Sequence, residues 1–389
     1  MSNHGEPVIS LVIPTRERCE TLKYTLKTAV DQASTEYEII VSDNFSQDDT
    51  KKIVEEFRDN RIKYINTGKR LSMCDNWDFA LEHLRGEYVI FIGDDDGVMP
   101  GAIDRLQEII RKQPSAIYFW QAHQYTWPID NVEPLVDFVA PAKKPFVMDL
   151  KKLVKFSIES GAWRYYRLPV LYHSAVSKNI LDTIRRRTGR VFHSTNPDVF
   201  MSFALPVFAD KAINVGESIT VNGRSAKSNG ASSISKNGQA VLDRFIREYP
   251  GYQMHKTLYP DVSFQVNMIP DSALVAMDLF PEYYKGMTFN YSAMWAYIMR
   301  LTKFNNWFGI MKRRKLIKQY HSFSVVKFTF HSLIHKISAI RQNINSKKVI
   351  DSERDIPSNI FDFARMMASR KEYAHGNGKI LLSADKDAS

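Results

Sequence analysis

The sequence predicts an α/β fold with a mostly parallel, Rossmann-like central sheet. Over the first 120 residues, short β-rich runs alternate with segments whose apolar residues recur at helical spacing, which is typical of a doubly wound sheet. The run EYVIFIG at 87–93 is apolar on both faces, which indicates a central strand. Beyond residue 238 the chain reads as mainly helical. We therefore expect one domain over residues 1–225 and a basic, mainly helical C-terminal region over residues 226–389.

Four further strands are predicted, each short and rich in β-branched or aromatic residues. They are ISLVIP at 9–14, YEIIVS at 37–42, IKYIN at 62–66 and AIYFW at 116–120. Four helices are expected between the strands, from apolar residues that share one helical face. These residues are Leu22, Leu26, Val30 and Ala33; Ile53, Val54 and Phe57; Trp77, Leu81 and Leu84; and Ile103, Leu106 and Ile110.

Local signals mark where helices begin or end. Ser46, with Asp49 three residues on, resembles a helix start, Gly86 resembles a C-terminal stop, and Pro100 is expected to open a helix. The Ser-, Asn- and Gly-rich run at 222–238 reads as a mobile loop or linker. From about residue 128 the periodicity is interrupted by Pro128, Pro134, Pro141 and Pro145.

Composition and targeting signals are those of an ordinary globular protein. Apolar residues make up 44% of the sequence and charged residues 25%, which argues against disorder. Cys19 and Cys74 fit neither a disulfide framework nor a metal-ligand spacing, so we expect inert thiols in a reducing compartment. The sequence shows no secretory signal and no apolar run of about 18 residues. We therefore expect a cytoplasmic location.

The net charge of +10 is concentrated near the C-terminus. Between Glu282 and Asp351 there are thirteen lysines and arginines and no acidic residue, and the run includes KRRK at 312–315. Together with FSVVKFTFHSLIHKISAI at 323–340, this basic segment predicts peripheral binding to an anionic membrane, on its inner face. The alternative is that the apolar residues pack on the rest of the protein and the charges are only solvated.

Polar clusters follow three of the predicted strands at the point where each strand ends. Because ligands bind at the carboxyl ends of the strands in an open parallel sheet, we expect the three clusters to meet in one crevice. The clusters are Pro14, Thr15 and Arg16; Asp43 and Asn44; and Asp94, Asp95 and Asp96.

The three consecutive aspartates would repel one another unless a cation offsets their charge. Oxygen ligands suit a hard ion, Mg²⁺ or Mn²⁺, which takes one or two carboxylates and completes its coordination with phosphate and water. The sequence therefore predicts a divalent metal and a substrate that carries a diphosphate. The simpler alternative, an acidic turn that caps the helix after Pro100, leaves the other two clusters unexplained.

Other phosphate-binding and metal-binding motifs are absent. The sequence has no GxxxxGK[ST] run, no GxGxxG after the first strand, no HExxH and no paired-cysteine site. A P-loop, a dinucleotide-binding fingerprint and these zinc sites are therefore excluded.

Three motifs resemble those of the inverting glycosyltransferase family 2, which has the GT-A fold. PTRER at 14–18 is similar to the family's PTYNR, VSDNFSQDDT at 41–50 to its VVDDGSTDDT, and GEYVIFIGDDDGVMP at 86–100 to its GEYIxFLDxDDxxxP. The match covers about residues 8–112 in the correct order and spacing. The resemblance implies a nucleotide-sugar donor, for which we expect a UDP-sugar, a divalent metal (Mn²⁺ or Mg²⁺), and inversion at the anomeric carbon.

The resemblance also implies roles for single residues in the donor site. Pro14, Thr15 and Arg18 would border the nucleotide. Asp43 would accept a hydrogen bond from the base, and Asp94 would lie near the ribose.

The same resemblance makes Asp95 the main metal ligand, supported by Asp96. Gly93 stands where the family has the first aspartate of the run, which leaves the division of ribose and metal roles among the carboxylates open. Phe45 replaces a glycine of the family and is expected to reshape the base pocket.

A direct displacement also needs a carboxylate on the acceptor side to take the hydroxyl proton. The candidate is Asp198, in FHSTNPDVFMSF at 192–203, because the family often places its base just before a helix after the donor half. The alternative is that NPD at 196–198 is a plain helix cap. His193 would assist, bind metal or be structural. If Asp198 is not the base, the next candidates are Asp182, Glu159 and His193.

Two cations near the loop-like run, Arg224 and Lys227, would fold over the diphosphate and neutralise leaving-group charge, unless they belong to a solvated loop. The QxxRW signature of processive synthases is absent, so we expect transfer of a single sugar. The expected acceptor is a glycan or lipid-linked glycan of surface polysaccharide synthesis.

Two other functions stay open. A non-catalytic protein that binds nucleotide sugars or nucleic acid would fit the sheet and the basic region, but it would need neither Asp198 nor the three aspartates, and we expect no nucleic acid as a partner. A nucleotidyltransferase also uses metal and carboxylates, but it should carry a basic glycine-rich loop after the first strand, which PTRERCETL at 14–22 lacks.

Overall fold

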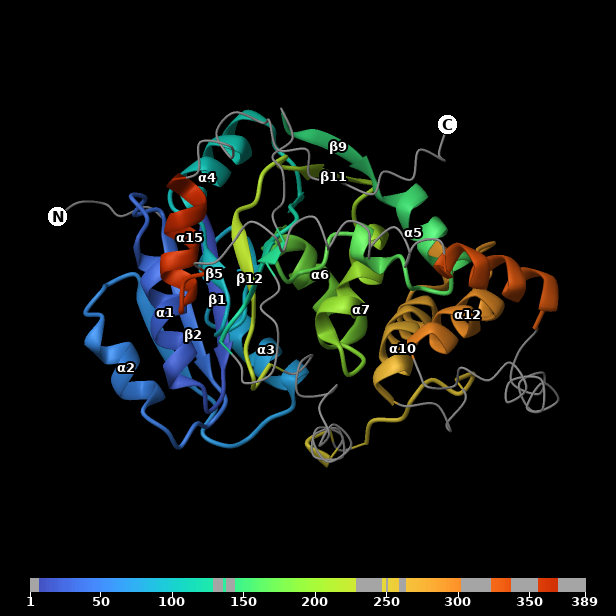
Figure 1. Ribbon diagram of the computed structural model, residues 1–389, viewed down its shortest axis with the longest axis horizontal. Helices are drawn as coiled ribbons and strands as arrows, with labels where there is room; N and C mark the ends of the chain where they lie inside the picture. Colours follow the sequence, from blue (N-terminus) through green and yellow to red (C-terminus); the bar gives the residue numbers. More distant parts are fainter. Residues whose placement is uncertain are drawn as a thin grey trace.

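The computed structural model describes residues 7–128, 136–137, 144–228, 247–249, 251–258, 264–301, 323–336 and 356–369. Within these residues two sheets organise the fold (Figure 1). The larger sheet has the strand order β3-β2-β1-β4-β10-β6-β11-β9, and the smaller sheet has the order β5-β12-β7-β8.

The strands of the larger sheet are β1 (Ile9–Thr15), β2 (Tyr37–Asp43), β3 (Ile62–Asn66), β4 (Tyr88–Phe91), β6 (Ile117–Phe119), β9 (Phe146–Asp149), β10 (Ser174–Ser177) and β11 (Lys211–Asn214). The four strands β3, β2, β1 and β4 are parallel, and β10 runs antiparallel between β4 and β6. The smaller sheet comprises β5 (Gly97–Val98), β7 (His123–Thr126), β8 (Val136–Asp137) and β12 (Thr220–Arg224). The predicted α/β fold with a mostly parallel sheet is confirmed, and EYVIFIG supplies the central strand β4.

The first four helices are those that the apolar spacing predicts, α1 (Cys19–Val30), α2 (Thr50–Glu56), α3 (Met73–Leu81) and α4 (Ala102–Lys112). The later helices are α5 (Leu150–Glu159), α6 (Lys178–Thr188), α7 (Pro197–Ala204), α10 (Phe264–Leu279), α11 (Pro281–Tyr284), α12 (Tyr291–Leu301) and α15 (Ile360–Ser369), with short 3₁₀ turns η1 (Tyr165–Arg167) and η2 (Leu205–Val207). The described part of the C-terminal region is thus mainly helical, as predicted.

Several predicted helix boundaries are wrong. Ala33 is exposed and lies beyond the end of α1. Ser46 does not start α2, which begins at Thr50, because the Ser46 hydroxyl instead accepts a hydrogen bond from the backbone N–H of Glu17. Helix α4 starts at Ala102, two residues after Pro100.

Gly86 does not end α3, which stops at Leu81. It allows a close backbone approach instead, because a Cβ at Gly86 would lie 2.5 Å from the backbone nitrogen of Ser10. The predicted loop at 222–238 is also wrong at its start, since residues 222–224 belong to β12. Residues 229–238 and the KRRK run at 312–315 lie outside the described residues.

The central strands place alternate side chains in two hydrophobic cores, one on each face of the larger sheet. Along β1, Val12 packs in the core that holds Trp77 of α3, whereas Leu11 and Ile13 pack in the core of α1 and α4. Both faces are therefore covered, as expected of a parallel sheet.

Segments from the C-terminal region join both cores. Helix α10 packs on α7, and α15 packs on α1 at the other side of the molecule (Figure 1). Phe363 of α15 is fully buried beside Tyr125 of β7. The proposed division near residue 225 therefore does not separate two independent cores. No described helix is both long and apolar enough to cross a membrane.

Candidate active site

The carboxyl ends of β1, β2 and β4 open into a cavity of about 880 Å³. The three polar clusters that the sequence singled out each contribute to its wall, and residues from several later segments complete it. The sequence-predicted site residues that line it are Pro14, Thr15, Arg18, Asp94, Asp95, Asp96, Asp198 and Arg224.

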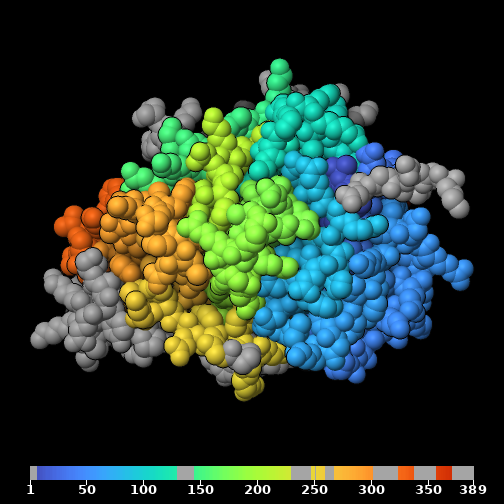
Figure 2. Space-filling view, turned by 180° about the vertical axis from the view of Figure 1, so that it is seen from behind, coloured from blue at the N-terminus to red at the C-terminus, as the bar shows by residue number. Residues whose placement is uncertain are grey.

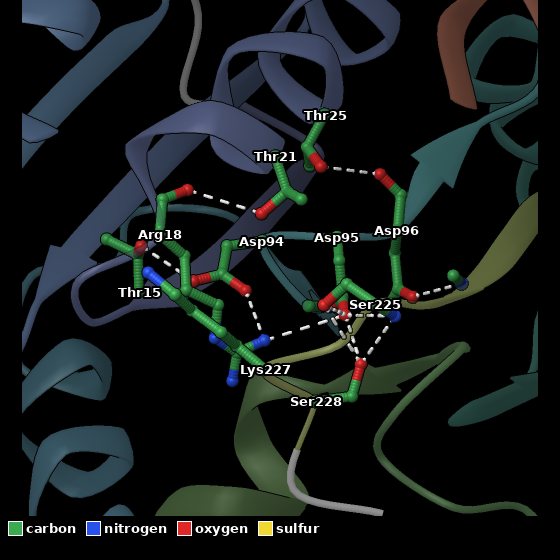
Figure 3. A network of polar contacts seen from close by, with 12 residues as sticks. Thr15, Arg18, Thr21, Thr25, Asp94, Asp95, Asp96, Ser225, Lys227 and Ser228 are labelled. Atoms are coloured by element: carbon green, nitrogen blue, oxygen red, sulfur yellow. Dashed lines mark hydrogen bonds and ion pairs between the residues drawn. The ribbon is translucent and has the colours of Figure 1, made fainter. Parts of the chain in front are cut away.

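Asp94 is held by residues that follow β1 (Figure 3). The Thr15 hydroxyl donates to its Oδ2 at 2.7 Å, and Arg18 Nη1 lies 2.8 Å from its Oδ1. The same Arg18 nitrogen is 3.6 Å from Asp95 Oδ2. One guanidinium thus lies between the first two carboxylates, and the two predicted nucleotide-binding residues Thr15 and Arg18 meet at this turn.

Asp95 faces the segment after β12. Its Oδ2 accepts hydrogen bonds from the Ser225 hydroxyl at 2.6 Å, from the Ser225 backbone N–H at 3.2 Å and from the Ser228 hydroxyl. Among the described residues, no hydrogen bond engages its second oxygen, Oδ1. This carboxylate therefore keeps one oxygen available in the cavity.

Asp96 is held mainly by backbone groups. Its Oδ1 accepts from the Gly223 N–H at 2.6 Å and its Oδ2 from the Gly93 N–H at 2.5 Å. Both glycines are required sterically. A Cβ at Gly223 would lie 1.7 Å from the carbonyl oxygen of Asp95, and a Cβ at Gly93 would lie 2.3 Å from the Tyr172 hydroxyl. Tyr172 thus fills the space that the family's first aspartate would need.

Burial dominates the electrostatics of this turn. Burial raises the pKa of Asp94 to about 6, against the opposing effect of Arg18. The pKa of Asp96 is raised well above its ordinary value by burial and by the neighbouring Asp95. The Asp94 and Asp95 carboxylates hold the Arg18 pKa above its usual value although burial opposes this. Arg18 therefore neutralises only part of the negative charge of the three carboxylates. A bound cation would neutralise the rest.

The donor atoms of this turn fit a hard divalent ion. Carboxylate and hydroxyl oxygens are the ligands that Mg²⁺ and Mn²⁺ prefer. In the described part of the chain, no group of three or more His, Cys, Asp or Glu side chains forms a ready-made metal site. Asp95 is the better placed of the two predicted ligands, because both oxygens of Asp96 are already engaged.

Asp43, the predicted base-binding residue, lies at the end of β2 and is buried. Its oxygens accept from the Ser46 N–H, from the Tyr64 hydroxyl and from the Asn66 amide. A carboxylate has about four acceptor positions, so about one is left for a ligand. Phe45 follows with a φ of 58°, a left-handed conformation that explains why glycine suits this position.

Asp198 lies in the first turn of α7 and lines the same cavity as the acidic turn. Burial raises the pKa of its carboxyl to about 6. The N-cap position of α7 is Asn196, which makes no side-chain capping hydrogen bond. Backbone N–H groups at Asp198 and Val199 hydrogen-bond to the Asp198 carboxyl and oppose the effect of burial on its pKa, so the helix-cap alternative stays beside the base assignment. A partly buried carboxylate that lines a cavity and has a raised pKa is suited to proton transfer.

The other three candidates for a base lie elsewhere. Asp182 forms an ion pair with Lys178 at 2.7 Å on the surface of α6, and Glu159 pairs with Lys155 at 3.8 Å. His193 contacts the Thr188 hydroxyl, and burial lowers its pKa to about 4. Of the four acidic or histidine candidates in the described chain, Asp198 is the one that lines the cavity.

The loop before α7 is held by the C-terminal region. Ser194 has a φ of 65°, and its hydroxyl donates to Asp271 Oδ2 at 2.8 Å. Asp271, in α10, is fully buried and also accepts from the Tyr252 hydroxyl and the His255 N–H. The Tyr249 hydroxyl donates to the Ser194 carbonyl oxygen at 2.8 Å. Residues far along the chain thus fix the entry to the helix that carries Asp198.

The C-terminal region also reaches the donor side of the cavity. Glu248 forms a half-buried ion pair of 2.6 Å with Arg16, and both residues line the cavity. Arg224 is exposed at the end of β12, and Lys227 Nζ donates to the Glu17 carbonyl oxygen at 2.9 Å. Both predicted cations, Arg224 and Lys227, therefore border the same cavity.

Sequence reasoning missed several residues of this site. Ser225 and Ser228 contact Asp95, yet they belong to a run whose composition is that of a linker. Tyr172 and Glu248 have no motif around them. The glycine Gly223, within an otherwise β-like run, was the one available signal, because glycine inside a strand often marks a close backbone approach.

The fold and the cavity define an α/β protein whose parallel strands end at an acidic turn, with the carboxylate of Asp198 in the same cavity. The family model of glycosyl transferase family 2 matches residues 10–173, which contain nearly all of β1, the strands β2 to β9 and the acidic turn. The chain therefore carries a glycosyl transferase family 2 domain.

Two curated relatives each match about a quarter of this chain. The chain is 36% identical over 105 residues to the GalNAc(5)-diNAcBac-PP-undecaprenol β-1,3-glucosyltransferase of Campylobacter jejuni, covering 26% of this chain and 34% of the relative. It is 29% identical over 89 residues to the UDP-Glc:α-D-GlcNAc-diphosphoundecaprenol β-1,3-glucosyltransferase WfaP of Escherichia coli, covering 23% and 36%. The matches span about a third of these relatives.

Among solved structures, the chain is similar to S. aureus TarS 1–349 in complex with UDP-GlcNAc. The TM-score is 0.47 and the identity is 13%, over 83% of this chain and 89% of that one.

Proposed function

We propose that this protein transfers a single sugar from a nucleotide-diphosphate sugar, with a UDP-sugar expected, to an acceptor hydroxyl. One observation carries the proposal. The acidic turn of a family 2 domain and the separate carboxylate of Asp198 share one cavity of about 880 Å³. A site that only binds nucleotide sugars has no need of the second carboxylate.

On the donor side, Pro14, Thr15 and Arg18 border the nucleotide, and Asp43 offers its remaining acceptor position to the base. Asp94 lies near the ribose. The assignment is supported by their positions at the carboxyl ends of β1, β2 and β4, where ligands bind in open parallel sheets.

Asp95 would hold the metal, Mn²⁺ or Mg²⁺, and Asp96 fixes the turn that carries Asp95. A metal ion held there would supply positive charge for the departing diphosphate. Arg224 and Lys227 add positive charge from the rim of the cavity.

On the acceptor side, Asp198 takes the proton of the attacking hydroxyl. Direct attack by the acceptor inverts the anomeric carbon, so an α-linked donor gives a β-linked product. The raised pKa of Asp198 supports this role, because a base with a pKa near 6 is ionised at neutral pH and still accepts a proton readily.

We propose a glycan or lipid-linked glycan as the acceptor. Two matching relatives bear names with undecaprenol-linked diphosphate acceptors. The protein then acts in the cytoplasm, at the inner face of a membrane, in the synthesis of surface polysaccharide.

The proposal is tested by incubating the protein with UDP-sugars, Mn²⁺ and an undecaprenol-diphosphate-linked saccharide, followed by NMR of the product. A β-linked product with one added sugar is expected. A product with retained configuration would remove the inverting mechanism. Nucleotide binding without transfer to any glycan acceptor would favour the non-catalytic alternative, and nucleotide transfer would favour a nucleotidyltransferase.

A further inference from the structure

The helix formed by residues 325–336 has two apolar faces, one buried and one exposed. Phe328 and His335 point inward and are only 1% and 2% exposed, whereas Val326, Phe330 and Leu333 are 79%, 61% and 57% exposed. The spacing of four and three residues places the last three on one side of the helix. A globular protein normally puts polar residues there, so this stripe needs an explanation.

Cations flank the stripe. Lys327 and Lys336 are both exposed on the same helix. They belong to the segment between Glu282 and Asp351, which has no acidic residue to offset them. We refer to Val326, Lys327, Phe330, Leu333 and Lys336 together as the apolar–basic face.

The helix is anchored to the body of the protein by its inner side. The ring centroids of His335 and Trp163 lie 4.5 Å apart, and those of Trp163 and Tyr166 lie 6.2 Å apart. Tyr166 is itself 47% exposed, so a second large aromatic residue borders the same region. The helix, orange-red in Figures 1 and 2, lies at the end of the molecule beyond α12, away from α2.

We propose that the apolar–basic face docks the protein on an anionic phospholipid bilayer. Val326, Phe330 and Leu333 enter the boundary between headgroups and acyl chains, and Lys327 and Lys336 meet the lipid phosphates, as in interfacial amphipathic helices. A second copy of the chain is the poorer occupant, because pairing two such faces would oppose two segments of uncompensated positive charge. Only the purpose of this docking rests on the proposed function. Docking would hold the enzyme at the surface where a lipid-linked acceptor lies.

The test is co-sedimentation of the full chain with vesicles of phosphatidylglycerol and phosphatidylcholine, compared with phosphatidylcholine alone. We expect binding to the anionic vesicles and its loss, by at least about ten-fold, in the double variant Phe330→Glu with Leu333→Glu. The matched control is Phe146→Glu with Val147→Glu, which removes exposed apolar residues (50% and 62% exposed) from the edge strand β9 and should bind as the wild type does.

Light scattering and UDP binding accompany the test. UDP binding by both double variants shows that they are folded. Equal vesicle binding by the wild type and the Phe330→Glu, Leu333→Glu variant, or no wild-type binding, overturns the proposal, as does a wild-type dimer that this variant makes monomeric. Vesicle binding by a protein that transfers no sugar would contradict the proposed function and leave the docking face intact.

Discussion

The two sides of the cavity are built in different ways. On the donor side, the carboxylates of Asp94 and Asp96 are held by groups that lie close to strand ends, including backbone N–H groups of glycines. On the acceptor side, Asp198 depends on a loop whose Ser194 is fixed by Asp271, 77 residues farther along the chain.

This difference explains why the two sides differ in how well sequence reveals them. A site made by strand ends needs particular residues at fixed spacing, so it leaves motifs. A site held by long-range side-chain contacts needs only partners of matching shape and polarity, and such partners leave no local pattern. We therefore expect substitutions on the donor side to weaken nucleotide binding as well as transfer, and substitutions on the acceptor side to lower transfer alone.

The largest effect is expected from Asp95→Asn. Loss of the carboxylate charge removes the main metal ligand, and we expect transfer to fall by roughly a thousand-fold or more, with nucleotide affinity in Mn²⁺ weakened about 10–100-fold. Initial rates and calorimetry of UDP binding measure both effects. Asp104→Asn, a carboxylate of α4 outside the cavity wall, is the control. Unchanged UDP affinity in Asp95→Asn, with no effect of EDTA, would contradict the donor site.

Asp198→Asn should separate chemistry from binding. A positioned base contributes typically 10²–10⁴-fold, so kcat should fall by that factor while the Kd for UDP stays near the wild-type value. Asp182→Asn, which changes a surface carboxylate of α6, should retain activity. Near-normal transfer by the Asp198 variant would reject this base and return the search to Asp182, Glu159 and His193.

The pH dependence should report the same group. Burial raises the pKa of Asp198 to about 6, and the base must be ionised to act, so activity is full above this pH and declines as the pH falls through about 6. On the acidic side, kcat/KM is expected to fall about ten-fold for each pH unit. The residual activity of Asp198→Asn should lose the part of this decline that belongs to Asp198, while Asp94, whose pKa burial also raises to about 6, contributes its own part. If kcat/KM of the Asp198→Asn variant falls with pH as steeply as that of the wild type, an ionisable group other than Asp198 causes the fall.

Asp271→Asn tests the support of the acceptor side. The change weakens the hydrogen bonds from Ser194 and Tyr252 to a buried carboxylate, so we expect about 1–3 kcal/mol lower stability and roughly ten-fold lower kcat. Donor affinity should be unchanged, because Asp271 lies behind the acceptor loop. Asp271→Glu should recover part of kcat. Equal losses in kcat and in UDP affinity would mean that the variant disturbs the whole cavity.

The smallest effect is expected from Arg16→Gln. Its side chain and that of Glu248 are both still reached by solvent, at 23% and 18% exposed, and solvent-accessible ion pairs contribute about 0–1 kcal/mol. The Kd for UDP should therefore change by less than about five-fold. Glu248→Gln should give the same result, and the double variant should add little. A much larger loss would assign Arg16 a direct contact with the nucleotide.

Sequence alone predicted the strands of the first half because each is a short apolar run between turn signals. It also predicted the convergence of Thr15, Asn44 and Asp94, because parallel strands end on one edge. It failed at Ser46, whose hydroxyl binds Glu17 instead of capping a helix. The composition of a Ser-rich run cannot reveal that Ser225 contacts a carboxylate 130 residues earlier.

The central claim is that the acidic turn holds the donor diphosphate through a metal. A crystal structure of the protein with UDP and Mn²⁺, with anomalous scattering to locate manganese, tests it most directly. We predict a manganese peak within coordination distance of an oxygen of Asp95, next to the bound diphosphate. A nucleotide bound elsewhere, or a diphosphate at this turn without metal when Mn²⁺ is saturating, would contradict the account.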